Sequence, residues 1–247
     1  MALSGAGTGI GSAIAQRLSN EGATLSLFAR GGERLEAVAN SLSGPVMHAS
    51  CDVRDRAAVE AFFARAAEQN GPIHALVANA GIGGPNMDGD DDRFDDLVQT
   101  NLTGTYSCMR AALRHLADGP DARHLVLMSS ILARIGVPAY TGYCASKAAL
   151  TGLARAFAAE LAPQNIQVNA ICPGWVDTQM ARDGLNDMAT GMGITPEAAY
   201  DIAMQAVPMG RMSEPEDIAG MVAWLLSKDS RGVTGQALDM NGGAFML

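Results

Sequence analysis

The stretch Ser4-Gly5-Ala6-Gly7-Thr8-Gly9-Ile10-Gly11 follows a short apolar start and precedes a helical pattern that begins at Ser12. Its spaced glycines allow a tight turn, a close approach of the backbone to a pyrophosphate, and close packing of a helix on a strand. The following helix N-terminus would offer N–H donors to phosphates. Structural turns are also glycine-rich, so the cluster alone is a weak signal. Its place between a strand and a helix favours a dinucleotide-binding site.

Outward from this loop, short apolar runs alternate with helical patterns along the whole chain. We predict helices near 11–21, 33–41, 55–69, 91–117, 141–162 and 215–227, and strands at 2–3, 24–29, 46–51, 75–79, 124–129, 166–172 and 236–240. Continuous apolar runs are typical of strands that are buried on both faces of a parallel sheet. Strand-helix alternation requires crossover connections. The sequence therefore predicts an α/β fold, a doubly wound (Rossmann) seven-stranded parallel sheet with helices on both faces.

The composition is that of an ordinary globular protein, and no linker or shift in composition divides it. We expect a single domain over residues 1–247, in which only an irregular insert at about 178–212 breaks the strand-helix rhythm. That insert carries six methionines, whose flexible thioethers suit a lid over a hydrophobic substrate. The alternative is that the methionines simply pack the insert against the domain.

Charge and cysteine usage exclude several classes of function. Seventeen Lys and Arg against 26 Asp and Glu give a net charge of −9 with no basic run, so we expect no nucleic-acid partner and no membrane partner. No apolar stretch is long enough to span a bilayer, and we expect a cytoplasmic protein. The four cysteines are far apart, which indicates reduced core residues and no metal site.

Tyr143 and Lys147 lie four residues apart in a helical pattern, so their side chains share one face of the helix. A free tyrosine has a pKa near 10, but an adjacent ammonium together with an oxidised nicotinamide favours the phenolate. Such a tyrosine can take a proton from an alcohol or give one to a carbonyl. Ser130, at the end of a predicted buried strand, could hold the substrate oxygen. The alternatives are that Tyr143 and Lys147 are simply an i,i+4 side-chain pair on the surface of a helix, and that Ser130 belongs to a turn at the end of the strand.

Taken in order, these motifs resemble the short-chain dehydrogenase/reductase family over essentially the whole chain. The matching features are the Gly-x-x-x-Gly-x-Gly spacing, Cys51-Asp52-Val53, Asn79-Ala80-Gly81, Ser130, Tyr143-x-x-x-Lys147 and Pro173-Gly174. The resemblance implies a catalytic set of Asn101, Ser130, Tyr143 and Lys147, with Asn101 carrying a water-linked proton relay behind the lysine. Ser129 is the less favoured of the two adjacent serines.

The resemblance also implies which residues bind the cofactor and how the chain assembles. Asp52 and Val53 would hold the adenine, Asn79 would line the cleft, and Val176 and Thr178 would face the nicotinamide amide and phosphates. The full cofactor set is Ser4, Gly5, Thr8, Gly9, Ile10, Gly11, Arg30, Asp52, Val53, Asn79, Ala80, Gly81, Tyr143, Lys147, Pro173, Gly174, Val176 and Thr178. A homotetramer or homodimer would use the helices at 141–162 and 215–227, with an apolar surface of Met221, Trp224 and Leu225.

The end of the second strand bears on the choice of cofactor. An acidic residue there selects NAD by binding the ribose 2′-hydroxyl, but this chain reads Phe28-Ala29-Arg30-Gly31. A guanidinium at Arg30 can pair with a 2′-phosphate. Thr8 is not the second basic residue that many NADP-preferring relatives carry, and Arg30 could simply be solvated. The sequence favours NADP, with NAD as the alternative.

These observations together predict an NADP(H)-dependent oxidoreductase that interconverts a secondary alcohol and a ketone. Its small-molecule substrate is expected to be a hydroxyacyl or oxoacyl compound or a related hydrophobic hydroxy compound, because Pro208-Met209-Gly210-Arg211 resembles 3-oxoacyl and polyketide ketoreductases. The segment Pro163-Gln164-Asn165 offers no basic residue to an acidic carrier protein, which favours a free or CoA-linked substrate. The alternatives are an NAD-dependent alcohol or hydroxy-acid dehydrogenase, a cofactor-dependent epimerase or dehydratase, and a non-catalytic cofactor-sensing protein.

Overall fold

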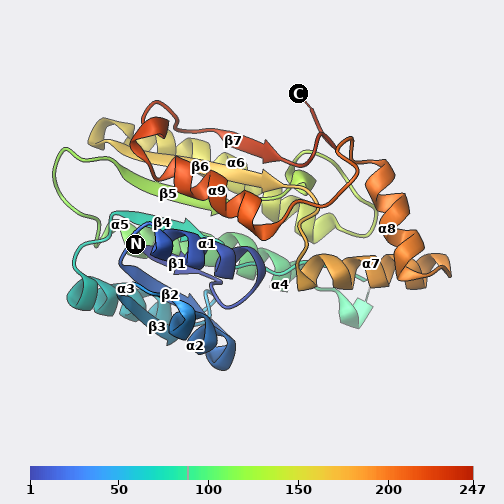
Figure 1. The fold of residues 1–247 in the computed structure, drawn as a ribbon, viewed down its shortest axis with the longest axis horizontal. Coiled ribbons are helices and arrows are strands. Elements are labelled where there is room, and N and C mark those ends of the chain that lie inside the picture. Colours follow the sequence, from blue (N-terminus) through green and yellow to red (C-terminus); the bar gives the residue numbers. More distant parts are fainter. Residues whose placement is uncertain (88, 247) are drawn as a thin grey trace.

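A seven-stranded parallel sheet forms the centre of the molecule (Figure 1). The computed structural model describes residues 1–87 and 89–246. The strands lie in the order β3-β2-β1-β4-β5-β6-β7, and every neighbouring pair is parallel. Their bounds are β1 (Ala2–Ser4), β2 (Leu25–Ala29), β3 (Val46–Ser50), β4 (Ala75–Ala78), β5 (Arg123–Met128), β6 (Ile166–Pro173) and β7 (Ala237–Met240). The predicted fold class is confirmed, with each strand within one residue of its predicted bounds.

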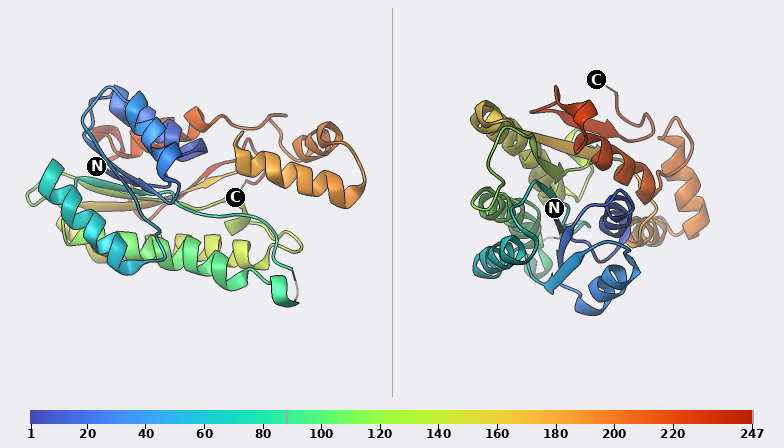
Figure 2. Two further views of the ribbon diagram at one scale, coloured as in Figure 1. Left: turned by 90° about the horizontal axis from the view of Figure 1, so that it is seen from below. Right: turned by 60° about the vertical axis from the view of Figure 1, so that its left-hand side comes forward.

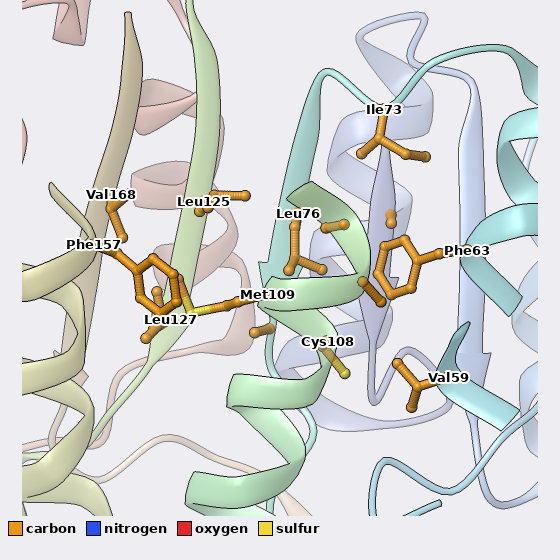
Figure 3. Close-up of a cluster of buried hydrophobic side chains, with 14 of the residues drawn as sticks. Val59, Phe63, Ile73, Leu76, Cys108, Met109, Leu125, Leu127, Phe157 and Val168 are labelled. Atoms are coloured by element: carbon orange, nitrogen blue, oxygen red, sulfur yellow. The ribbon is translucent and has the colours of Figure 1, made fainter. Parts of the chain in front are cut away.

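Helices cover both faces of this sheet. One layer contains α1 (Gly9–Asn20), α2 (Gly32–Ser41) and α9 (Pro215–Leu225), and the other contains α3 (Arg56–Asn70), α5 (Thr105–Leu113) and α6 (Thr141–Leu161). Figure 2 shows the two layers on opposite sides of the strands. The cores of the layers are separate clusters, because every residue of β4, β5 and β6 is buried and side chains point alternately into each layer. Figure 3 shows the cluster beneath α5 and α6, which includes Phe63, Leu76, Met109 and Phe157.

The predicted helix at 91–117 is interrupted by a π-helical turn. Helix α4 (Phe94–Val98) continues into the π turn Gln99–Gly104 and then into α5. Close packing accompanies the change, since a Cβ atom at Gly104 would lie 2.6 Å from Cγ2 of Val53. The π turn places Asn101 in the interior, where the residue is 0% exposed. Single π turns of this kind are frequent at functional sites.

The stretch at about 178–212 interrupts the strand-helix alternation with two successive capped helices, so it is regular helical structure and not irregular chain. Thr178 is the N-cap residue of helix α7 (Gln179–Met192), and Thr195 is the N-cap residue of helix α8 (Pro196–Gln205). Each threonine side chain accepts a hydrogen bond from the backbone N–H three residues later, which satisfies the helix start. Both helices extend beyond the carboxyl ends of the strands (Figure 1).

The methionines of this region are buried or exposed, apart from Met188, which is half-buried. Met204 and Met212 are buried with Leu185 in a small separate core, so the packing explanation holds for these two. Met180, Met192 and Met209 are 49%, 52% and 63% exposed, respectively. Among the described residues, no helix is both long enough and apolar enough to cross a membrane.

Candidate active site

The site lies where the strand order reverses, between β1 and β4. Loops from these two strands run in opposite directions and leave a crevice at the carboxyl edge of the sheet, which is the usual ligand site in this architecture. The glycine loop follows β1, and Thr178 follows β6. The structure brings the two together, because a Cβ atom at Gly9 would lie 3.0 Å from Cγ2 of Thr178.

The glycine loop has the geometry of a phosphate cradle. Gly5 and Gly9 have φ angles of +66° and +53°, which favour glycine. A Cβ atom at Gly11 would lie 2.0 Å from the Gly5 carbonyl oxygen, so only glycine fits there. Within the described part of the chain, Thr8 forms no side-chain hydrogen bond to the start of α1. First-turn N–H groups of α1, including that of Ile10, are thus left for an anionic ligand, and the loop fits a dinucleotide.

Ser4 and Asn79 join the two strand ends beneath this loop. The buried Ser4 hydroxyl accepts hydrogen bonds from the N–H groups of Asn79 at 3.0 Å and Ala80 at 2.9 Å. The Asn79 amide donates to the Gly5 carbonyl at 3.2 Å. Both polar side chains are therefore used within the protein, and they hold the crevice in shape.

The three residues predicted to bind the adenosine part of the cofactor differ in exposure and in their contacts. Arg30 is exposed beside the end of β2. The Asp52 carboxylate is held by Arg54, with a shortest contact of 2.7 Å, and these hydrogen bonds lower the pKa of Asp52. The Val53 side chain is buried against Gly104, so the group that Val53 can offer to an adenine is its backbone.

Arg34 is a second exposed cation at this end, which our sequence analysis missed. Its Nε atom lies 3.5 Å from the position that a Cβ atom at Gly31 would occupy, so the guanidinium folds back over the turn that follows Arg30. The spacing Arg30-x-x-x-Arg34, across a turn and the first turn of a helix, was a signal that could have found it. Arg54 is less available, since Asp52 and Asp96 both bind it.

The predicted cofactor residues at the end of β6 and after it are mostly packed within the protein, and few of their side chains are free to contact a cofactor. The Gly174 N–H donates to the Met240 carbonyl at 2.9 Å, and a Cβ atom at Gly174 would lie 2.9 Å from Cα of Asn241. Pro173 is the last residue of β6, and both it and Val176 are buried. The Thr178 hydroxyl caps α7 and donates to the Val176 carbonyl at 3.2 Å.

Tyr143 and Lys147 lie on the inner face of α6, as the spacing predicts. The Lys147 ammonium is 5.6 Å from the centre of the Tyr143 ring and donates to the Met128 carbonyl at 2.9 Å. Ser130 follows β5, and its hydroxyl accepts from the N–H of Leu132 at 3.2 Å. The neighbouring Ser129 donates its hydroxyl proton to the Lys147 carbonyl at 2.8 Å. Ser129 thus fixes the helix, while Ser130 faces Tyr143.

Burial controls the ionisation of both groups. Removal from water raises the pKa of Tyr143, and a hydrogen bond with Ser130 acts in the opposite direction. Removal from water also lowers the pKa of Lys147 to about 8. In the protein alone the tyrosine is therefore held neutral, which differs from the phenolate that the sequence analysis expected beside the lysine and an oxidised nicotinamide. A neutral phenol is a proton donor.

Asn101 completes the group from the opposite side. Its amide donates to the Ser146 hydroxyl at 3.1 Å, and Ser146 is a further residue that the sequence analysis missed. A Cβ atom at Gly81 would lie 3.1 Å from Oδ1 of Asn101 and 3.2 Å from Nζ of Lys147. Glycine at this position leaves room for both side chains. The structure thus gathers all four predicted catalytic residues at one edge of the sheet.

Comparison with known proteins identifies the class of this site. The family model described as enoyl-(acyl carrier protein) reductase matches residues 5–244. The chain is 36% identical to a putative ketoacyl reductase of Streptomyces coelicolor, over 98% of this chain and 95% of the relative. It is 32% identical to a 3-oxoacyl-(acyl-carrier-protein) reductase of Haemophilus influenzae, over 99% and 97% of the two chains.

Solved structures agree with the sequence comparison. A crystal structure of an actinorhodin polyketide ketoreductase variant with NADPH is similar with a TM-score of 0.92 and 35% identity, over 98% of this chain and 96% of that one. Levodione reductase is similar with a TM-score of 0.89 and 31% identity, over 98% and 95% of the chains. The fold and site define an oxidoreductase. The chain belongs to the short-chain dehydrogenase/reductase family.

Proposed function

We propose that this chain is an NADPH-dependent ketoreductase that interconverts a ketone and a secondary alcohol. The observation that carries the proposal is the gathering of Ser130, Tyr143, Lys147 and Asn101 at the sheet edge that also holds the glycine loop. A non-catalytic cofactor sensor would not need this set. A redox-neutral epimerase or dehydratase would leave the cofactor unchanged after each turnover.

In this mechanism Ser130 orients the substrate oxygen and Tyr143 transfers the proton. The bound nicotinamide supplies the hydride that becomes the new C–H bond. The Ser130 hydroxyl donates a hydrogen bond to the substrate carbonyl oxygen and orients it. The neutral Tyr143 phenol gives its proton to that oxygen as negative charge develops there. A positioned proton donor of this kind contributes about 10² to 10⁴ in rate.

Lys147 and Asn101 support the phenol after it has lost its proton. The Lys147 ammonium, fixed by the Met128 carbonyl, stabilises the phenolate electrostatically. Asn101 keeps the strand-end loop and α6 together through Ile82 and Ser146, and the resemblance to the family gives it the water-linked relay that returns a proton. In the alcohol-oxidising direction the same groups act in reverse.

The preference for NADPH rests on the adenosine end of the crevice. Arg30 and Arg34 place two exposed guanidinium groups at the end of β2. Guanidinium groups pair with phosphate through strong charge-assisted hydrogen bonds. The similar actinorhodin ketoreductase variant was crystallised with NADPH, which supports the same assignment.

Helices α7 and α8 form the proposed substrate lid over residues 178–212. Met180, in the first turn of α7, lies over the crevice, since a Cβ atom at Gly83 would be 3.0 Å from its sulfur and 3.7 Å from Cε2 of Tyr143. This thioether provides an apolar wall beside the reacting oxygen. We assign an oxoacyl or related hydrophobic substrate, in agreement with relatives named as ketoacyl reductases. The acidic net charge favours a free or CoA-linked form. The proposed cytoplasmic location is supported by the four unpaired cysteines, which suit a reducing compartment.

A substrate and cofactor panel tests this proposal. Purified protein is incubated with NADPH or NADH and a series of 3-oxoacyl-CoA esters, N-acetylcysteamine thioesters and simple ketones, and nicotinamide absorbance is followed. Consumption of NADPH with formation of the secondary alcohol is the expected result. A product that forms without any change in nicotinamide absorbance would instead identify an epimerase or dehydratase. Binding of NADPH without turnover of any substrate would leave the cofactor sensor as the better assignment.

A further inference from the structure

The segment after β4 is bound to the start of the helix that carries Tyr143 through Asn86, by its side chain and its backbone. Its Oδ1 atom accepts hydrogen bonds from the Gly142 N–H at 3.0 Å and from the Thr141 hydroxyl at 3.1 Å. Separately from the side chain, the backbone N–H of Asn86 donates to the Ala139 carbonyl at 2.9 Å. Asn86 therefore caps the first turn of α6 from a segment more than fifty residues away in the sequence.

The start of α6 depends on this contact. Within residues 1–87 and 89–246, Tyr140, the residue just before the helix, forms no side-chain capping hydrogen bond. Ala139 has a φ angle of +64°, a left-handed conformation that is unfavourable for alanine. Residues held in such conformations persist only where surrounding contacts enforce them. The hydrogen bond from the Asn86 backbone N–H to the Ala139 carbonyl is such a contact, and it is kept when only the Asn86 side chain is changed.

The other end of the same segment is held by Asn101. The Oδ1 atom of Asn101 accepts from the Ile82 N–H at 2.8 Å, and its Nδ2 atom donates to the Ile82 carbonyl at 3.0 Å. Between these two anchors lies Gly83, which faces the Tyr143 ring and Met180. The segment 82–86 is thus one wall of the crevice, with an asparagine anchor at each end.

We propose that Asn86 is a positioning residue for the reduction, which acts by holding the first turn of α6 so that Tyr143 faces the substrate oxygen. Gly142, which receives the cap, directly precedes Tyr143. Helix α4 closes the other side, since a Cβ atom at Gly142 would lie 3.2 Å from Cα of Phe94. A shift of about 1 Å at a reacting group can cost about 10² in rate.

This inference rests on the proposed ketoreductase function, and three variants test it. Asn86→Ala removes the side-chain cap, and Asn86→Asp keeps an oxygen that can accept from Gly142. Because Nδ2 of Asn86 donates to the Asp92 carboxylate at 3.2 Å, Asn86→Asp is made together with Asp92→Asn, so that two carboxylates do not meet. Asn70→Ala is the control for the loss of a bound asparagine side chain, because the Asn70 amide donates two hydrogen bonds, to the Leu25 carbonyl at 3.2 Å and the Ser26 hydroxyl at 3.0 Å. These bonds lie at the start of β2, at the opposite edge of the sheet from the crevice.

The expected result is a selective loss of kcat. Asn86→Ala should lower kcat about tenfold or more while the Kd of NADPH changes less than about twofold, and Asn86→Asp should recover kcat to within about threefold of the parent. Asn70→Ala should lower the thermal unfolding temperature and leave kcat at the parent value. The inference is overturned if kcat of Asn86→Ala stays within about twofold of the parent, or if the Ala and Asp variants lose equal activity.

A titration separates failure of this inference from failure of the proposed function. The ionisation of Tyr143 is followed by phenolate absorbance, with Tyr143→Phe as the blank in each background. Burial raises the pKa of Tyr143. Loosening of α6 in Asn86→Ala therefore should move the transition to lower pH, while Asn70→Ala should not. An unchanged transition overturns the inference even if no substrate is turned over. If Asn86→Ala does not fold, Thr141→Val, which removes one of the two donors to Oδ1, should give a smaller shift of the same sign.

Discussion

The Lys147 ammonium donates a hydrogen bond to the Met128 carbonyl at 2.9 Å, at the end of the strand that leads into Ser130. This contact joins the catalytic helix to the catalytic strand. It also holds a cation in a place where the residue is 4% exposed. The enzyme thus carries a desolvated charge, and its use in the proposed mechanism is to stabilise the Tyr143 phenolate.

Replacement of Tyr143 by phenylalanine is expected to keep the fold and the affinity for NADPH while removing nearly all turnover. The substitution deletes the proton donor and leaves the ring in place. We expect kcat to fall by about 10² to 10⁴, the usual contribution of general acid–base catalysis. Thermal unfolding and NADPH fluorescence titration are the controls. Turnover within a few-fold of the parent would contradict the assigned role.

Stability should depend on pH through Lys147. Burial lowers the pKa of Lys147 to about 8 in the folded protein, against 10.5 for the unperturbed group. Between these two values the unfolded state binds the proton and the folded state does not, so the free energy of unfolding rises as pH rises. Each pH unit inside this window adds at most about 1.4 kcal/mol.

Urea unfolding of the parent and of Lys147→Met measures this dependence. The difference in free energy of unfolding, parent minus variant, should be flat below about pH 8 and should rise from there toward pH 9.5. The methionine variant should also be inactive but the more stable of the two proteins near neutral pH, because it no longer buries an ammonium. A difference that stays constant across the window would show that the ammonium is not desolvated.

Arg30→Ala is expected to weaken NADPH binding by about 1.5 to 3 kcal/mol and to leave NADH binding almost unchanged, which is the scale of hydrogen bonds to a charged group. Arg34→Ala should act in the same direction, since its guanidinium lies over the turn beside Arg30. Arg65→Ala, on the exposed side of α3 and outside the expected subunit interface, is the matched control. Titration that shows tighter binding of NADH than NADPH by the parent would reverse the cofactor assignment.

The oligomer expected from family resemblance can be tested on α9. The predicted apolar surface is partly wrong, because Leu225 is 1% exposed and packs in the core beneath the helix. Trp224 is 37% exposed and points outward. We expect the parent to sediment as a dimer or tetramer, and Trp224→Glu to shift it toward the monomer. Trp224→Phe should keep the assembly, and a monomeric parent at micromolar concentration would refute the expectation.

The strands were predictable because their apolar runs are buried on both faces, a pattern that few other structures produce. β5, all of whose residues are buried, was found within one residue. Helices α7 and α8 were not found, because Gly184 and Gly191 weaken the helical pattern and the apolar face packs only a small local core. The threonine caps at 178 and 195 were the signal that could have found them.

The positions of the two candidate catalytic residues on α6 were predictable because their spacing is local, whereas the contacts that support them are not. Tyr143 and Lys147 are four residues apart, but Asn86 and Ser146 act on segments far from them in the sequence. A single sequence does not reveal such contacts. The same holds for the ionisation of Tyr143, since its direction follows from burial, which only the folded structure shows.

The π turn Gln99–Gly104 makes the chain between α4 and α5 one residue longer than a regular α-helix of the same span. Each residue of an α-helix turns by about 100°. Deletion of a single residue here would therefore restore an uninterrupted helix and rotate α4 relative to α5 by about that angle. Asn101 would then leave Ile82, and α4 would leave Gly142. The rotation of α4 relative to α5, on which both contacts depend, is thus set by one additional residue in the π turn.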